Sequence, residues 1–273
     1  MVNVSMEKLK IAITGIGTDT SGNLFRSICE YPVMSELCTP IVYDSAGQET
    51  ALRNLDEGKV DALVLTVEPT KKPAEAIEII VTGKTNFMPV SKEPTAEDVV
   101  KFRDILERDF DLRSPRIAIV QESPIQTLDF ASQVTAEQGI NTYGPYTTEQ
   151  ILTEDAVCHF DGIIVKNGEH LMQRLITDPS QEAPVRYFAG MKSVITAVYR
   201  PVHIDEAGDG VADVSELTHP IYTAIDIIRN RAFFDEARQN ILPKLFHDKR
   251  EERKQNGAPQ ASTNNDNTEQ AYE

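Results

Sequence analysis

Short apolar runs alternate with longer amphipathic segments along most of this chain. Three of these runs, at 9–14, 60–66 and 116–120, are mostly apolar and rich in Val, Ile and Leu. Runs of this kind are typical of strands that are buried on both faces of a parallel sheet. The alternation therefore predicts an α/β fold with a largely parallel sheet.

The same pattern gives the positions of the expected elements. Gly58, Gly83 and Gly139 each follow an amphipathic segment, as expected for residues that end helices. Thr95 and Asp98 are spaced as in a capping box at a helix start. We expect strands at 9–14, 40–43, 60–66, 116–120, 161–165 and 193–198, and helices at 23–31, 48–58, 74–82, 95–110, 125–138, 170–176 and 217–244.

The charge balance narrows the choice of partners. The chain has 27 Lys and Arg against 43 Asp and Glu, a formal net charge of −16. This excess of negative charge argues against nucleic acid or an anionic membrane as a partner, because phosphate groups need a positive surface. The three cysteines form no CxxC pair, and residues 1–10 lack the apolar core of a signal peptide. We therefore expect a cytoplasmic protein with reduced thiols.

The length of 273 residues allows one large domain or two modest lobes. We expect a first α/β lobe formed by 7–82 together with 205–247, and a second formed by 83–204. Residues 249–273 are almost entirely polar. We expect this tail to be disordered, because it cannot bury enough apolar surface to offset the entropy of ordering it.

Two glycine-containing segments partly match known ligand-binding loops. Residues 15–22 lie between an expected strand and an expected helix, but they lack the third Gly of a dinucleotide loop and the Lys of a P-loop. Residues 205–216 match several positions of a calcium loop, but Ala207 stands where a ligand oxygen is needed. A flexible turn between strand and helix is the simpler interpretation of the first segment, and a tight turn before the last helix is the simpler interpretation of the second.

Several segments together resemble the 4-hydroxythreonine-4-phosphate dehydrogenases, the NAD-dependent enzymes of vitamin B6 synthesis. Residues 198–213 are similar to that family's run S-V-D-H-G-T-A-F-D-I-A-G-K-G-I-A-D, and shorter similar segments occur in the same order at 11–14, 60–64, 82–87, 117–124 and 141–145. The resemblance covers most of residues 8–240. It implies a two-lobed fold of the isocitrate/isopropylmalate dehydrogenase type, and a homodimer with its site in the cleft between the lobes.

At the metal positions implied by this resemblance, the sequence departs from the family. The family holds a divalent metal with three His residues, while hydride passes from the phosphorylated hydroxy-amino acid to NAD. The first position is Glu122 here, the second falls in a deletion after Gln138, and the third is Lys166. Because a protonated lysine repels a cation, we expect no metal site. A rebuilt site would need another set of side chains to converge: Glu122, Glu169, His170 and His203.

The substrate and cofactor positions implied by the resemblance have changed as well. The family's G-H-T-E run reads Gly-Lys-Thr-Asn at 83–86, and the positions of a phosphate-contacting Lys and of an Asn are both Arg here. The implied catalytic positions are Lys84, Thr85, Glu122 and Lys166. The implied substrate or anion-binding positions are Thr85, Arg174 and Arg186. The implied cofactor positions are Asp205, Gly208 and Gly210.

These substitutions favour a family member with lost or altered catalysis, because a fold can persist after its site has changed. The added cations would let the old cleft bind a small anion or a partner without a metal. NAD remains a candidate ligand. Two alternatives stay open: an active NAD-dependent dehydrogenase of a phosphorylated hydroxy acid with atypical ligands, and a dimeric interaction or scaffold protein.

Overall fold

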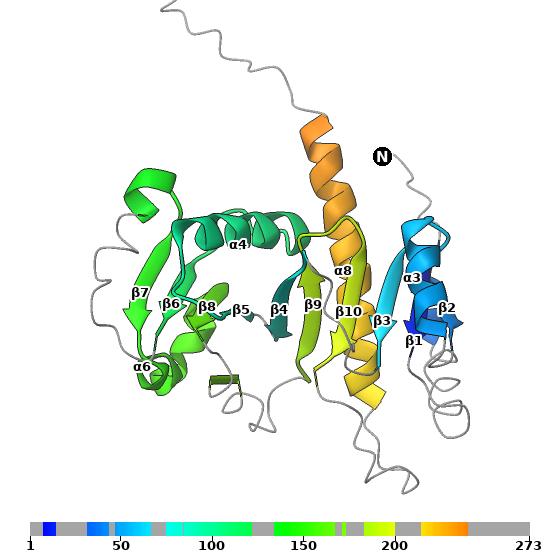
Figure 1. Ribbon diagram of the computed structural model, residues 1–273, viewed down its shortest axis with the longest axis horizontal. Coiled ribbons are helices and arrows are strands. Elements are labelled where there is room, and N and C mark those ends of the chain that lie inside the picture. The colour runs from blue at the N-terminus through cyan, green and yellow to red at the C-terminus, as the bar shows by residue number, and fades with distance from the viewer. Residues whose placement is uncertain are drawn as a thin grey trace, which may run out of the picture. The chain divides into compact units, whose positions relative to one another are not determined.

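The computed structural model describes residues 8–14, 32–43, 47–66, 75–83, 85–121, 134–166, 171–172, 183–199 and 214–239. The chain forms two compact units, residues 1–235 and 236–273. The first unit contains the whole described sheet (Figure 1). Of the second, the structure describes 236–239, which are helical.

The strands are β1 (Leu9–Thr14), β2 (Cys38–Val42), β3 (Ala62–Leu65), β4 (Ile77–Thr82), β5 (Thr85–Val90), β6 (Ile117–Val120), β7 (Thr142–Tyr146), β8 (Gly162–Lys166), β9 (Val185–Ala189) and β10 (Val194–Val198). The helices are α2 (Pro32–Leu37), α3 (Gln48–Asp56), α4 (Ala96–Asp109), α6 (Thr148–Leu152), the 3₁₀ helix η2 (Thr153–His159) and α8 (Val214–Gln239). Among the described residues, no helix combines the length and the apolar character needed to cross a bilayer.

The strands form one mixed sheet in the order β2-β1-β3-β10-β9-β4-β5-β8-β6-β7. Six of the nine neighbouring pairs are parallel, and the antiparallel pairs are β10-β9, β9-β4 and β4-β5. The parallel pairs fall into two blocks, β2-β1-β3-β10 and β5-β8-β6-β7, which β9 and β4 connect. The predicted α/β class with a largely parallel sheet is confirmed.

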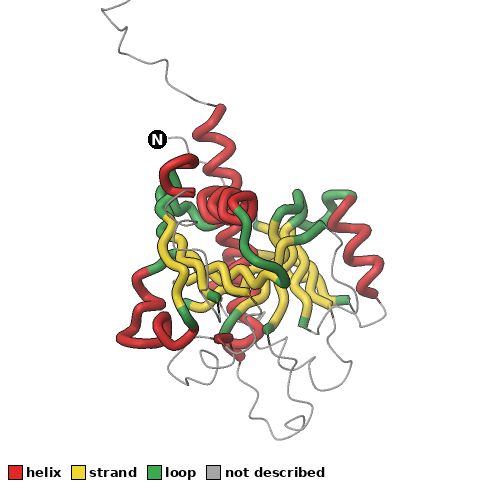
Figure 2. The backbone as a smooth tube through the Cα atoms, turned by 60° about the vertical axis from the view of Figure 1, so that its left-hand side comes forward, coloured by secondary structure: helices red, strands yellow, loops and turns green. Residues whose placement is uncertain are grey.

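Helices cover both faces of this sheet (Figure 2). On one face, α4 contributes Phe102 and α8 contributes Ile225 to the core cluster that contains Tyr187. On the other face, α3 packs Leu55 into the cluster that contains Phe188. The neighbours Tyr187 and Phe188 of β9 thus point to opposite faces, as the two-residue period of a strand requires.

The local signals for helix starts and stops are confirmed where the structure describes them. The backbone N–H of Asp98 donates to Oγ1 of Thr95 at 3.2 Å, and the backbone N–H of Thr95 donates to the Asp98 carboxylate at 2.9 Å. Gly58 and Gly139 have φ values of 69° and 67°, the left-handed conformation that glycine adopts after a helix.

The expected strands are all present within a few residues, as are the expected helices at 48–58, 95–110 and 217–244. The expected helix at 23–31 lies outside the described residues, as do most of those at 125–138 and 170–176. The tail at 249–273 also lies outside them. The lobe ranges 7–82 with 205–247, and 83–204, stay a prediction.

The predicted helix at 74–82 is wrong. Residues Ile77–Thr82 form strand β4, which pairs with both β5 and β9. Five of its six residues are β-branched, and such side chains lose rotamer freedom in a helix but pack well on a sheet. Gly83 therefore follows a strand; its φ of 52° makes the tight turn into β5.

The sequence pattern also did not indicate β5, β7 and β9. Pro89 interrupts β5 and Pro145 interrupts β7, and proline normally argues against a strand because it donates no ladder hydrogen bond. In β9, Arg186 interrupts the apolar run. The pairing of these strands with their neighbours outweighs these local signals.

Helix α4 lies directly on β8 because Gly162 has no side chain. A Cβ atom added at Gly162 would lie 2.6 Å from the ring of Phe102 and 2.7 Å from the side chain of Leu106. Both side chains are fully buried in the core. Neither can move without disturbing the close packing around it.

Gly162→Ala is expected to lower the free energy of unfolding by about 1–3 kcal/mol, because the added methyl group overpacks the α4–β8 contact. Chemical denaturation would measure this change. In the double variant Gly162→Ala/Leu106→Ala the methyl group occupies part of the space that leucine leaves, so the double variant should lose less stability than the sum of the two single variants. Strictly additive losses would contradict the contact.

A buried carboxylate joins α4 to β9 and α8. Asp109 is fully buried and accepts hydrogen bonds from Arg108 at 2.7 Å, from Arg231 at 2.8 Å and from the hydroxyl of Tyr187 at 2.6 Å. Arg231 also donates to the Tyr187 hydroxyl oxygen and to the carbonyl of Lys192, both at 2.7 Å. This set of contacts, the Asp109 cluster, ties the end of α4 to the middle of β9 and to α8.

Burial alone would raise the pKa of Asp109, but hydrogen bonds from Arg108, Arg231 and Tyr187 outweigh it and hold the pKa below its ordinary value. Burial, reinforced by the neighbouring Asp109 carboxylate, raises the pKa of Tyr187, so its hydroxyl remains a donor. Because the folded-state pKa of Asp109 is lowered, its stabilisation is present above the unfolded-state pKa. It is lost as pH falls through the folded-state pKa.

Asp109→Asn is expected to lower the free energy of unfolding at neutral pH by about 3–5 kcal/mol, because the substitution leaves the arginines around a buried site without their counter-charge. The wild-type protein should lose stability as pH falls below about 4, and the variant should lose less over that range. Urea denaturation at a series of pH values measures both effects.

The matched control is Asp104→Asn, which changes an exposed carboxylate on the same helix. It should keep the wild-type stability at neutral pH to within about 1 kcal/mol. Parallel acid profiles for wild type and Asp109→Asn would contradict the role given to Asp109.

Candidate functional site

The structure describes Thr85, Lys166 and Arg186 among the positions that the resemblance singled out. The others lie outside the described residues: Lys84, Glu122, Arg174, Asp205, Gly208 and Gly210. The catalytic, substrate and cofactor assignments that involve them stay predictions. The three described residues can be placed on the sheet.

Thr85 is a buried residue at the first position of β5. Its Oγ1 lies 3.3 Å from the carbonyl oxygen of Val157 and 3.2 Å from that of Phe160, so the hydroxyl donates to the end of η2. These contacts fix η2 against the start of β5. Thr85, the threonine that the resemblance shares with the family, therefore has a structural role here.

Lys166 ends β8 and forms an ion pair with Glu93, which lies in the segment between β5 and α4. In the β5–β8 register, Lys166 is level with Val90, whereas Thr85 is five positions earlier. At about 3.3 Å per residue, Thr85 and Lys166 are roughly 16 Å apart along the strands. The structure does not bring these two residues together.

Arg186 lies in β9, level with Ile80 of β4, which in turn is level with Phe87 of β5. Because side chains alternate along a strand, Arg186 and Thr85 lie on the same face, with backbones about 12 Å apart. The guanidinium Nε of Arg186 lies 2.9 Å from the Glu78 carboxylate, and its Cζ lies 5.3 Å from the centre of the Tyr199 ring. Glu78 and Tyr199 thus orient Arg186.

Of the implied metal positions, the structure describes Lys166. A metal ligand must offer a lone pair, and the Lys166 ammonium, paired with Glu93, offers none. In the described part of the chain, no group of three His, Cys, Asp or Glu side chains is arranged to hold a metal ion. Lys166 therefore does not fit the family's metal, whereas Glu122, Glu169, His170 and His203 lie outside the described residues.

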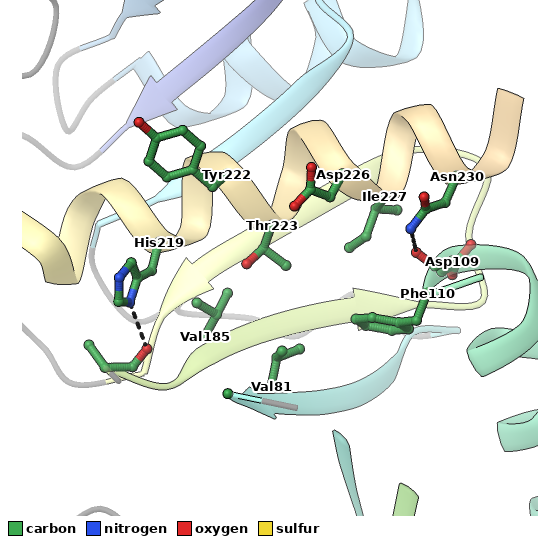
Figure 3. A pocket seen from close by; sticks show the side chains of 12 residues that line it. Val81, Asp109, Phe110, Val185, His219, Tyr222, Thr223, Asp226, Ile227 and Asn230 are labelled. Carbon is green, nitrogen blue, oxygen red and sulfur yellow. Dashed lines mark hydrogen bonds between the residues drawn. The ribbon is translucent and has the colours of Figure 1, made fainter. Parts of the chain in front are cut away.

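A pocket of about 280 Å³ lies on the opposite face from Arg186, between α8 and the ends of β4 and β9 (Figure 3). Gly83, Val185 and Phe110 line its walls, and α8 lines it with a stripe of side chains. Sequence reasoning missed this pocket. The stripe was visible in the expected helix at 217–244 as polar residues at helical spacing: His219, Thr223, Asp226 and Asn230.

Hydrogen bonds fix both ends of this stripe. Nδ1 of His219 lies 3.3 Å from the carbonyl oxygen of Ala183, and Nδ2 of Asn230 donates to the carbonyl oxygen of Asp109 at 2.9 Å (Figure 3). Asp226, whose side chain is exposed, lies between them along α8. Partial desolvation still raises the pKa of its carboxyl, in spite of the opposing charge of Arg229.

The chain is 30% identical over 175 residues to the 4-hydroxythreonine-4-phosphate dehydrogenase of Bacteroides thetaiotaomicron, a match that covers 60% of this chain and 48% of that enzyme. The similarity to the 4-hydroxythreonine-4-phosphate dehydrogenases that the sequence segments suggested is thus confirmed over these 175 residues. The match spans about half the length of the curated relative, and no family model matches.

Solved structures agree on the fold. A 4-hydroxythreonine-4-phosphate dehydrogenase from Burkholderia phymatum superposes with a TM-score of 0.55 at 13% identity, covering 81% of this chain and 98% of that one. The Klebsiella pneumoniae enzyme gives 0.56 at 14% identity, covering 82% and 98%. Isocitrate dehydrogenase from Methylococcus capsulatus gives 0.55 at 8% identity, covering 85% and 89%. The predicted two-lobed α/β fold of the isocitrate dehydrogenase type is confirmed.

Thr85→Val is expected to lower the free energy of unfolding by about 1 kcal/mol, because it removes the hydroxyl that holds η2. Thr39→Val, on the exposed side of edge strand β2, is the control and should leave stability nearly unchanged. Thermal denaturation of both variants measures the effect. Equal stability of Thr85→Val and wild type would contradict the structural task of Thr85.

Proposed function

We propose that this chain keeps the scaffold of the 4-hydroxythreonine-4-phosphate dehydrogenases without their metal-dependent oxidation. In this proposal, the ancestral cleft binds a small anionic molecule of the phosphorylated hydroxy-acid class. The relatives' names support the family, and the changed side chains support the loss of the metal. We expect the protein to act in the cytoplasm as a homodimer.

The ion pair between Lys166 and Glu93 is the observation that carries this proposal. By resemblance, Lys166 occupies the third position of the family's metal site. An ammonium group there repels a divalent cation and, paired with Glu93, offers no lone pair to a metal. Oxidation of the family's kind needs a metal ion that polarises the substrate oxygen. The Lys166 side chain does not bind such an ion.

Arg186 supports the second half of the proposal. Its Nε pairs with Glu78 on the same face as Thr85, and a guanidinium carries five N–H donors in a planar fork. Such a fork can contact the Glu78 carboxylate and a ligand phosphate together. Lys84 and Arg174, which the resemblance also places at substrate positions, would add to the positive charge.

Both halves of the proposal can be tested on the full chain. With NAD and 4-hydroxythreonine 4-phosphate, no NADH absorbance is expected in the presence of magnesium, manganese or zinc ions. Calorimetric titration with 4-hydroxythreonine 4-phosphate in the absence of metal is expected to show binding. Metal-dependent formation of NADH would contradict the first half, and absence of binding would contradict the second.

Arg186→Met is expected to weaken this binding by about tenfold, because it removes a charge-assisted hydrogen bond to phosphate. The matched control is Arg113→Met, which removes an exposed guanidinium from the loop after α4. It should bind the ligand as the wild type does. Equal weakening by both variants would show that only the overall charge matters and would contradict a site at Arg186.

A further inference from the structure

The outer strands of the described sheet, β2 and β7, each have one edge that pairs with no other described strand. Backbone N–H and C=O groups along such an edge can form a ladder with a strand of another molecule. Charged side chains often prevent this pairing, but β2 carries none, since its sequence is Cys-Thr-Pro-Ile-Val. The β2 edge therefore depends on another feature to stay single.

The hydrogen bonds to β1 show which residues of β2 face the open edge. The backbone N–H of Tyr43, directly after β2, donates to the carbonyl oxygen of Ile13 at 2.8 Å. Because successive residues of a strand direct their backbone groups to opposite sides, positions 39 and 41 also face β1. Positions 38, 40 and 42 direct theirs to the open edge, and Pro40 is the central one of these.

The β2 edge is accessible to another molecule. Thr39 is exposed, and Val42 exposes 42% of its surface, which is unusual for an aliphatic residue in this chain. A second copy of the chain can therefore approach the outward backbone groups on either side of Pro40.

Pro40 removes the donor that such a pairing would need most. In an antiparallel pair of two β2 edges centred on position 40, this residue and its counterpart would exchange N–H···O hydrogen bonds with each other. Proline has no N–H, and its ring occupies the space of the missing hydrogen. The pairing would lose its central hydrogen bonds in both directions.

The opposite outer strand has comparable features. Pro145 lies inside β7, and the register between β7 and β6 shifts between Ala118 and Val120. A proline and a bulge each interrupt the regular row of backbone groups that a new strand would need. Both outer strands of the described sheet are therefore poor templates for strand addition.

We infer that Pro40 keeps the β2 edge from pairing with the β2 edge of a second copy, and that Pro145 and the bulge protect β7 in the same way. Any homodimer of this chain accordingly forms through a surface other than these two edges. The inference does not depend on the anion-binding proposal.

Pro40→Thr tests this inference in the full chain, because it restores the outward N–H with a residue that favours strands. At equal concentration, the light scattering of the variant is expected to rise at least about threefold faster than that of the wild type. Hydrogen exchange gives a local readout. The Val42 amide should exchange rapidly in the wild type, and its exchange should slow as the concentration of Pro40→Thr rises.

Two further variants separate edge pairing from a loss of stability. Pro40→Thr/Val42→Lys adds a charge to the restored edge and should return the scattering to the wild-type rate. Pro184→Thr changes a partly buried proline before β9, away from the outer strands, and should scatter as the wild type does. Melting temperatures establish that each variant is folded.

The inference is overturned if Pro40→Thr scatters like the wild type, or if adding Val42→Lys does not reverse the faster scattering. It is also overturned if the Val42 amide is protected from exchange in dilute wild-type protein, because the edge would then already be covered.

Discussion

A single buried carboxylate organises the face of the sheet on which α4 and α8 pack. The Asp109 carboxylate is fully removed from water, and it is tolerated because Arg108, Arg231 and the Tyr187 hydroxyl all donate to it. A buried charge without such partners would be far too costly. The same contacts fix the distance between the end of α4 and α8, and with it the width of the pocket that Asp109, Phe110 and Asn230 border.

The antiparallel strands β9 and β4 are the second determinant of how sites are arranged. They connect two parallel blocks, and their side chains alternate between a face with the α8 pocket and a face with Arg186 and Thr85. One short stretch of sheet therefore serves two chemically different surfaces. One surface carries the Arg186 guanidinium, which pairs with Glu78, and the other carries the pocket beside α8.

Much of the fold could be predicted from the sequence because its signals are local. The strands at 9–14, 62–65 and 117–120 are mostly apolar, and the capping pair Thr95 and Asp98 needs only neighbouring residues. Strand β4 was misread because its short apolar segment before Gly83 fits either a helix or a strand. One of its two antiparallel partners, β9, is also distant from it in sequence. The Asp109 cluster joins residues up to 122 positions apart, which no local pattern reveals. The placement of Lys166 beside Glu93 likewise depends on tertiary structure.

We propose that this chain keeps the dehydrogenase scaffold without the family's metal. Elemental analysis of the full chain, purified without chelators and dialysed against each of magnesium, manganese, cobalt and zinc, tests it most directly. The account predicts no more of any divalent metal than the dialysis buffer contains. One tightly retained divalent ion per chain, lost when the residues around Lys166 are changed, would contradict it.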